Sequence, residues 1–190
     1  MAAGITVYEG KLKSQFKAKL LRPAKPGCDD QWSFVLLPKD ASAKLPRRGR
    51  TTVDGTINGY LFQETLEPDG QRSHWLKVST TLRKAAGAEV GDTVTLEIAP
   101  AKKEPEPEVP ADLKQALAAT PEALKVWKAT TTIARVDWIH WIVSAKQAKT
   151  RAKRIADACE MLADGKKRVC CFDPSGFYSK ALSAPDVAEP

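Results

Sequence analysis

The segment that most constrains the fold is PAKKEPEPEVP at residues 100–110, a little past the middle of the 190-residue chain. It contains four prolines and no aromatic residue. Such a segment cannot contribute a packed core and runs extended, as a semi-rigid spacer. The hydrophobic periodicity also changes across it. We therefore predict two domains, at residues 1–100 and 111–168, joined by a tether at 101–110 and followed by an irregular tail at 169–190.

Residues 1–100 contain short segments in which apolar and polar side chains alternate, as they do in half-buried strands. These segments are ITVYEGKL, QFKAKLL, WSFVLLP, TTVDGTI, YLFQETL, HWLKVS and TVTLEIA. Asn58-Gly59 supplies the positive φ of a type I′ hairpin, Asp69-Gly70 marks a second turn, and Ser79 or the threonine after it caps a short helix. Six or seven strands in about a hundred residues predict a small β-barrel, because closure removes exposed sheet edges.

Residues 111–168 follow helical spacing instead. Leu113 and Leu117 lie four residues apart in a first helix, and Thr120-Pro121 opens a second as N-cap and first helical residue. A third helix has an apolar face of Val136, Ile139 and Val143. Thr150 caps a fourth, whose apolar stripe is Ala152, Ile155, Cys159 and Leu162. The fold class we expect is α+β with two domains: a small N-terminal barrel and a C-terminal bundle of about four short helices.

Composition and charge indicate a soluble cytoplasmic protein. No apolar run approaches the ~20 residues that span a bilayer, and the first residues lack the apolar region of a secretory signal. The net charge is +7, with 17 Lys+Arg against 11 Asp+Glu in residues 1–103 and 13 against 12 thereafter. A positive field of this size can attract nucleic acid or anions, but it also keeps a protein in solution, which is the interpretation we favour.

The sequence contains no pattern of catalytic or cofactor chemistry. Its two histidines are His74, in a predicted strand, and His140, in a predicted helix, and a lone histidine in such a position usually serves as a surface or hydrogen-bonded residue. No glycine-rich phosphate loop, HExxH motif or nucleophile elbow occurs. The adjacent Cys170 and Cys171 suit neither a disulfide framework nor a zinc site. We expect no enzymatic activity, no metal and no cofactor.

Two parts of the chain resemble known bacterial families. VDGTINGYLFQETLEPDGQRSHWLKVSTTLRKAAGAEVGDTVTLEI is similar to a widespread domain of unknown function. VPADLKQALAATPEAL and WIHWIVSAKQAKTRAKRIADACEMLADGKK together resemble the YdeI/OmpD-associated, bacteriocin-protection family. The first resemblance implies a double-split β-barrel akin to AbrB-like barrels. The second implies a part in envelope stress and in resistance to bacteriocins or cationic peptides.

These resemblances lead to the function that we expect. It is a non-enzymatic binding or adaptor role in bacterial stress or in bacteriocin and antimicrobial-peptide tolerance. The partner is an unknown protein or a small anionic ligand, the chain has no membrane span, and it acts as a monomer or homodimer. Because one fold hosts many functions, the role rests on the resemblance alone.

The alternative function is a nucleic-acid-binding regulator, since AbrB-like barrels bind DNA as dimers. Arg47, Arg48 and Arg50 lie in the loop PRRGR beside the predicted barrel. Arginines in such a loop can neutralise phosphates and bind without sequence preference. No pattern of aromatic residues for stacking single-stranded bases accompanies them.

The most basic stretch is KQAKTRAKRI at residues 146–155. Cations in the first turn of a helix oppose its dipole, whose N-terminus favours anions. A bound anion would satisfy both the cations and the backbone N–H groups, which makes a candidate anion site of Lys146, Thr150, Arg151 and Arg154. Two alternatives remain open: a carboxylate from elsewhere in the chain, or a solvated surface on which Asp157 and Glu160 offset part of the charge.

Three tryptophans form the last candidate. Trp138 and Trp141 are three residues apart and so lie on the same side of their helix, and Trp127 belongs to the helix before. We expect these rings to pack between helices in the core rather than to form a cage that stacks a ligand.

Overall fold

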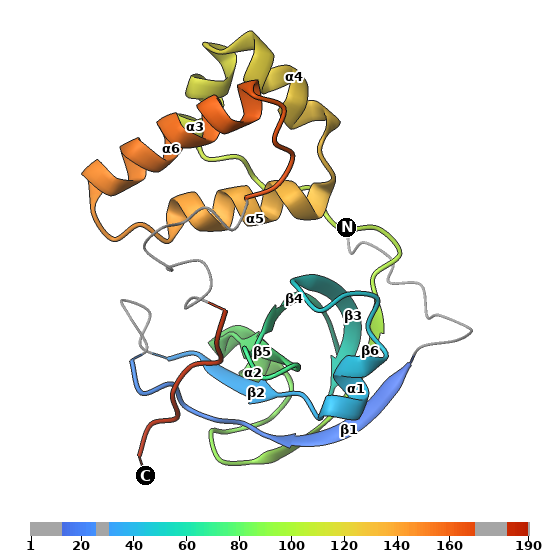
Figure 1. Cartoon of the computed structure of the whole chain (residues 1–190). Coiled ribbons are helices and arrows are strands. Elements are labelled where there is room, and N and C mark those ends of the chain that lie inside the picture. Colours follow the sequence, from blue (N-terminus) through green and yellow to red (C-terminus); the bar gives the residue numbers. More distant parts are fainter. Residues whose placement is uncertain (1–12, 26–30, 170–181, 190) are drawn as a thin grey trace. The chain divides into compact units, whose positions relative to one another are not determined.

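The computed structural model of the chain describes residues 13–25, 31–169 and 182–189 (Figure 1). It divides into two compact units, residues 1–102 together with 183–190, and residues 103–182. The chain therefore leaves the first unit after residue 102 and returns to it at residue 183. The predicted strand ITVYEGKL and the Cys170-Cys171 pair lie outside the described residues.

The first unit is a nearly closed barrel of six antiparallel strands, which confirms the barrel predicted from the alternating pattern (Figure 1). The strands are β1 (Ser14–Lys19), β2 (Ser33–Leu36), β3 (Thr51–Ile57), β4 (Tyr60–Pro68), β5 (His74–Val78) and β6 (Thr93–Pro100). Their order in the sheet is β1-β6-β3-β4-β5-β2. Leu21 and Phe34 exchange two backbone hydrogen bonds, of 2.8 and 2.9 Å, so the chain just after β1 is joined to β2 at the far end of the sheet.

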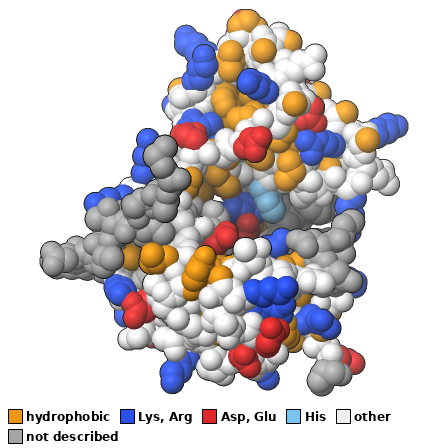
Figure 2. Space-filling model, turned by 180° about the vertical axis from the view of Figure 1, so that it is seen from behind, with side chains coloured by type: hydrophobic (Ala, Val, Ile, Leu, Met, Phe, Trp, Pro, Cys, Tyr) orange, Lys and Arg blue, Asp and Glu red, His pale blue; other side chains and the backbone are white. Residues whose placement is uncertain are grey.

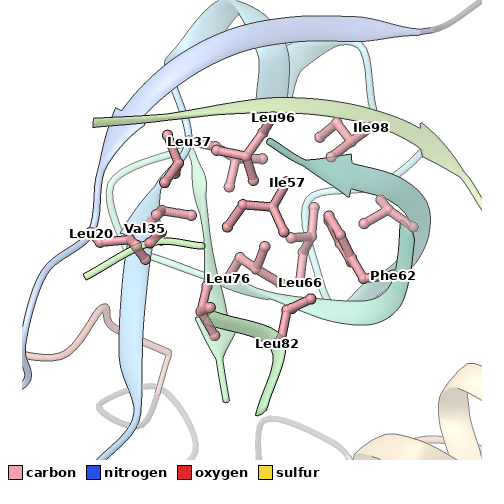
Figure 3. Packing of buried hydrophobic residues seen from close by; sticks show 14 residues of the cluster. Leu20, Val35, Leu37, Ile57, Phe62, Leu66, Leu76, Leu82, Leu96 and Ile98 are labelled. Carbon is pink, nitrogen blue, oxygen red and sulfur yellow. The ribbon is translucent and has the colours of Figure 1, made fainter. Parts of the chain in front are cut away.

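The interior of the barrel is filled almost entirely by aliphatic side chains, most of them from the inward-facing positions of the strands (Figure 3). The buried set is Leu20, Val35, Leu37, Val53, Ile57, Phe62, Leu66, Leu76, Val78, Leu82, Ala88, Val94, Leu96 and Ile98. Strands β3 and β6 approach each other closely at Gly55, where a Cβ atom would overlap the carbonyl oxygen of Glu97. Glycine is therefore required at this position of β3.

The predicted hairpin turn at Asn58-Gly59 and the predicted cap at Ser79 are both present in the barrel unit. The β3–β4 hairpin turns at Asn58 and Gly59, with φ of 49° and 84°, the positive values that a type I′ turn needs. Two short helices belong to the barrel unit, α1 (Lys39–Ala43) and α2 (Thr80–Ala85). Ser79 caps α2, because its hydroxyl accepts a hydrogen bond of 3.1 Å from the backbone N–H of Leu82.

The second unit contains α3 (Ala111–Ala118), α4 (Pro121–Ala129), α5 (Thr132–Val143) and α6 (Ala148–Ala163). Their buried cluster consists of Leu113, Leu117, Ala123, Trp127, Trp138, Trp141, Ile142, Ile155, Ala158, Cys159, Leu162 and Val169. Within the part of the chain that the structure describes, every helix is too short or too polar to cross a membrane.

The predicted apolar face of α5 is only partly right, because Ile139 packs against the core but does not lie at the centre of the buried face. Val136 and Ile139 are half-buried and Val143 is exposed, whereas the helix buries Ala134, Trp138, Trp141 and Ile142. Because α5 is apolar on most of its sides, spacing alone does not single out the face that packs inward. The large tryptophan rings determine which face of α5 packs inward, since they have the most apolar area to remove from water.

The predicted start of α6 is wrong. The helix begins at Ala148 with Gln147 as its N-cap, so Thr150 lies inside the first turn and does not cap it. Ala152 is exposed rather than part of the apolar stripe, and Ala158 takes a place beside the other three predicted members of that stripe.

Candidate functional site

The basic stretch at residues 146–155 covers the turn before α6 and the start of that helix. Arg151 makes a two-pronged ion pair with Asp112 in the first turn of α3, with Nε···Oδ2 at 2.7 Å and Nη2···Oδ1 at 3.0 Å. Parallel hydrogen bonds of this kind are the preferred geometry between a guanidinium and a carboxylate. Arg151 therefore binds a carboxylate from elsewhere in the chain, which was the first of the two alternatives to a bound anion.

This ion pair also shifts the pKa of both partners in the direction that favours their charged forms. The hydrogen bond from Arg151 lowers the pKa of Asp112 below its ordinary value, and the Asp112 carboxylate raises the pKa of Arg151. Asp112 lies where the N-terminus of α3 favours negative charge. The pair consequently joins the beginning of α6 to the beginning of α3.

Arg154 binds the end of a different helix. Its Nη1 donates hydrogen bonds to the carbonyl oxygen of Trp141 at 2.5 Å and to Ser144 Oγ at 3.1 Å. The guanidinium carbon lies 5.4 Å from the centroid of the Trp141 ring, in cation–π range. The last carbonyl groups of a helix lack partners within the helix and attract cations, so Arg154 completes the C-terminus of α5.

The remaining members of the candidate anion site face water. Lys146 and Thr150 are exposed, as is Lys149 beside them, and Lys153 pairs with Asp157 at 2.6 Å along the surface of α6. On the face drawn in Figure 2, basic and acidic side chains are interspersed rather than gathered into one patch of a single sign. The four candidate residues thus separate into two exposed side chains and two arginines that bind neighbouring helices.

A third arginine contact could not be predicted from the sequence. Arg135 of α5 donates from Nη2 to both carboxylate oxygens of Glu106, at 2.7 and 2.9 Å, and from Nη1 to the carbonyl oxygen of Thr130 at 2.7 Å. The Thr132 hydroxyl donates to the same carboxylate at 2.6 Å, and these hydrogen bonds lower the pKa of Glu106. The contact ties the proline-rich segment to α5. Alternating Glu and Pro in the tether gave no indication of which glutamate would be bound.

The three tryptophans are buried in the core of the helical unit, as predicted. Trp138 is fully buried, Trp127 and Trp141 nearly so, and the rings of Trp138 and Trp141 meet edge to face with centroids 6.1 Å apart. This is a favourable aromatic packing geometry. The rings support the helices and do not line an open cage.

The loop arginines of the nucleic-acid alternative have different environments. Arg50 is only 3% exposed, and its Nε lies 2.8 Å from the carboxylate of Glu67. Arg48 is exposed and donates to the carbonyl oxygen of Arg72 at 3.0 Å, and Arg47 is exposed as well. Two of the three side chains therefore reach the surface, and the third binds inside the barrel unit.

His74 holds parts of the barrel together. Its Nε2 lies 3.0 Å from the carbonyl oxygen of Gly49 and its Nδ1 lies 2.8 Å from Ser42 Oγ. A carbonyl can only accept, so Nε2 carries the proton and Nδ1 accepts from the Ser42 hydroxyl in the neutral ring. Burial lowers the pKa of His74, and both side chains are shielded from solvent. The other histidine, His140, is half-buried in the last turn of α5.

Comparison with known families identifies both units. Residues 16–98 match the domain of unknown function DUF1905, and residues 106–165 match the family described as bacteriocin-protection, YdeI or OmpD-associated. No curated protein matches the chain. No cluster of three or more His, Cys, Asp or Glu side chains that could hold a metal ion occurs among the described residues. The chain thus carries a DUF1905 domain followed by a domain of the YdeI/OmpD-associated, bacteriocin-protection family.

Proposed function

We propose that the protein is a non-enzymatic binding or adaptor protein of the bacterial cytoplasm that acts in stress or in tolerance of bacteriocins and antimicrobial peptides. The observation that carries the proposal is the match of residues 106–165 to the bacteriocin-protection family. These residues include the helices α3 to α6 that the structure describes in the second unit. We therefore assign the proposed role to the helical unit.

The contacts within the helical unit are consistent with a binding scaffold. Three arginines bind other helices or the proline-rich segment: Arg135, Arg151 and Arg154. Hydrogen bonds from charged groups contribute more to stability than neutral ones, so these contacts hold the helices in a fixed arrangement. A fixed arrangement presents the same exposed surface to every partner, which reduces the ordering cost of binding.

Within this unit we place the binding surface at the start of α6. Lys146, Lys149 and Thr150 are exposed there, next to the two arginines that fasten the helix. An acidic partner protein or a small anionic ligand would find cations and helix N–H groups on the same turn. The arginines then position the helix, and the lysines contact the partner.

A survival assay tests this proposal. Deletion of the gene should reduce survival when cells are exposed to a bacteriocin or a cationic peptide, and the intact gene should restore it. Complementation with Lys146→Glu/Lys149→Glu should restore survival poorly, because the surface becomes acidic. The matched control is Lys39→Glu/Lys44→Glu, which changes the net charge equally at exposed positions near α1 of the barrel unit. Unaltered survival of the deletion strain under every challenge would refute the proposed role.

The second hypothesis is a nucleic-acid-binding regulator built on an AbrB-like double-split barrel, with Arg47, Arg48 and Arg50 at the interface. A gel-shift assay at several salt concentrations separates it from the first. The hypothesis requires DNA binding that weakens steeply with salt and is lost in Arg47→Ala/Arg48→Ala. Arg50 needs separate treatment, because it is buried and its replacement perturbs the barrel as well. No match supports this hypothesis, and we rank it second.

A further inference from the structure

The C-terminal segment at residues 183–189 pairs with the barrel through one antiparallel β-bridge. Pro23 and Val187 form an antiparallel bridge. On either side of it, the N–H of Ala24 donates to the carbonyl oxygen of Asp186 and the N–H of Ala188 donates to that of Arg22, both at 2.8 Å. This is the hydrogen-bonding pattern of an antiparallel β-ladder around a non-hydrogen-bonded pair. Proline fits at the centre of the pattern, since no N–H is needed there.

On the barrel side, the contact is made by the residues that follow β1, where the chain continues past the end of its pairing with β6. Leu20 exchanges backbone hydrogen bonds with Gly91 and Asp92 on the β6 side, both at 2.8 Å. Beyond Leu20 the same side of the strand is bonded to the C-terminal segment instead. Unpaired backbone groups at a sheet edge are a template for another strand, and here residues 183–189 use it.

A second contact fixes where the C-terminal segment lies. The N–H of Ala184 donates to the carbonyl oxygen of Asp69 in the β4–β5 turn at 3.3 Å. That turn is well ordered, because the Asp69 side chain accepts two backbone hydrogen bonds of 2.7 Å, from Gln71 and Ser73. In Figure 1 the C-terminal segment is drawn in dark red and leads to the chain end.

The contact depends on backbone pairing and charge more than on apolar burial. Val187, the central side chain of the segment, is 49% exposed. Asp186 and Glu189 are exposed on the segment, and Arg22 and Lys25 are exposed on the barrel edge. The two sides carry opposite charge, which favours this pairing and weakens at high salt. The exposed charges that flank the pairing favour an extended acidic segment at this edge.

We propose that residues 22–24 form a peptide-docking edge, which holds the chain's own residues 184–188 and accepts an acidic extended segment of a partner protein in their place. The binding mode is β-augmentation, in which main-chain hydrogen bonds supply affinity and flanking side chains supply selectivity. The edge lies in the barrel unit, outside the residues matched to the bacteriocin-protection family. Its test is therefore independent of the proposed tolerance role.

The chain's own residues 184–188 compete with any partner segment for this edge. A covalently attached segment acts at an effective concentration of about a millimolar. For a segment with a Kd of about 0.1 mM, the intact chain should therefore bind a free peptide ~10-fold more weakly than a chain whose own segment is removed. Two variants vacate the edge in different ways. One ends at residue 182. The other is the full chain with Ala188→Pro, which lacks the N–H donated to Arg22.

The experiment is a titration with a synthetic peptide of residues 183–189, followed by amide NMR signals of the barrel. We expect saturable shifts at Arg22 and Ala24 in both variants, and much smaller shifts in the intact chain at the same peptide concentration. A control peptide with lysine at the positions of Asp186 and Glu189 should bind more weakly, because it repels Arg22 and Lys25. Unchanged signals of Val53 and Ile57 in the core show that each variant remains folded.

Three outcomes would overturn the proposal. One is that millimolar peptide does not shift the amide NMR signals of residues 22–24 in either folded variant. Another is that the intact chain and both variants bind the peptide equally well. The last is that the intact chain forms dimers through exchanged C-terminal segments, which would make a second copy, and not a partner protein, the natural occupant.

Discussion

Arg154 of α6 donates a hydrogen bond of 2.5 Å to the carbonyl oxygen of Trp141, near the end of α5. The same guanidinium reaches Ser144, the C-cap of α5, and lies over the Trp141 ring. One side chain therefore serves a helix end and an aromatic ring together. A cation that looked unfavourable near the start of α6 is stabilised by the negative end of the neighbouring helix.

Replacement of Arg154 should destabilise the helical unit. Arg154→Ala removes a charged hydrogen bond to a half-buried carbonyl, and we expect a loss of about 1–2 kcal/mol in the free energy of unfolding. Arg154→Lys should recover only part of it, because an ammonium does not reproduce the planar guanidinium that lies over the Trp141 ring. Urea unfolding monitored by tryptophan fluorescence measures the change. Lys153→Ala is the neighbouring control, since it breaks only an exposed pair and should cost less than about 0.5 kcal/mol.

Acid should weaken the link between α3 and α6. The pKa of Asp112 is lowered in the folded chain by Arg151, so the folded state binds its proton less readily than the unfolded state does. The stabilisation is present above the ordinary carboxyl pKa of about 3.9 and is lost as the pH falls through the lower folded value. Because the pair is largely exposed, the loss should stay below about 1 kcal/mol.

The comparison that isolates this effect uses Asp112→Asn. Unfolding free energies of both proteins are measured at neutral pH and near pH 3. The wild type should exceed the variant at neutral pH, and the difference should shrink in acid. A difference that is the same at both pH values would mean that the Asp112 charge contributes nothing to the link.

The barrel should lose stability as the pH falls through the ordinary range of histidine. Burial lowers the pKa of His74 in the folded state, so below about pH 6.5 the unfolded chain binds a proton that the folded chain resists. Stability from the neutral ring is therefore present above this pH and declines below it. Melting temperatures at pH 7.5 and 5.5 measure the decline. His74→Asn should melt lower at both values and with a smaller difference between them, whereas an equal pH dependence in both proteins would assign the effect to another group.

Gly55 should tolerate no side chain. A Cβ atom at this position would overlap the backbone oxygen of Glu97 and press on Phe62 and Ile98. We expect Gly55→Ala to destabilise the barrel by about 2–3 kcal/mol, because strands β3 and β6 must separate to admit the methyl group. Gly49→Ala is the control, since nothing lies within 4 Å of a Cβ there and its effect should be within about 0.5 kcal/mol. Equal unfolding midpoints for the two variants would contradict the close approach.

Features encoded by neighbouring residues could be predicted from the sequence. The alternating segments form the barrel, Asn58-Gly59 forms the hairpin turn, and Ser79 caps α2. The tryptophans were recognised as core residues because large aromatic rings gain most from burial. In each case the physical cause acts over a few residues, through backbone dihedral preference or through the period of the apolar side chains.

Features that join distant residues required the tertiary structure. Asp112 and Arg151 are 39 residues apart, Glu106 and Arg135 are 29 apart, and residues 22–24 pair with a segment near the other end of the chain. Many carboxylates could neutralise each arginine, and the alternation of Glu and Pro around Glu106 does not choose among them. The charge of an arginine does not specify which carboxylate it will bind. The partner is determined by the packing of the helices that carry the two charges.

The basic stretch at residues 146–155 has some features that the sequence predicts and others that only the tertiary structure determines. Its charge and its helical character followed from the sequence, because composition and period are local properties. Its division into exposed lysines and two arginines that bind α3 and α5 depends on how the apolar face of α6 packs. Burial of Ile155, Ala158, Cys159 and Leu162 sets the rotation of that helix. Once the rotation is set, Arg151 faces Asp112 of α3 and Arg154 faces the end of α5.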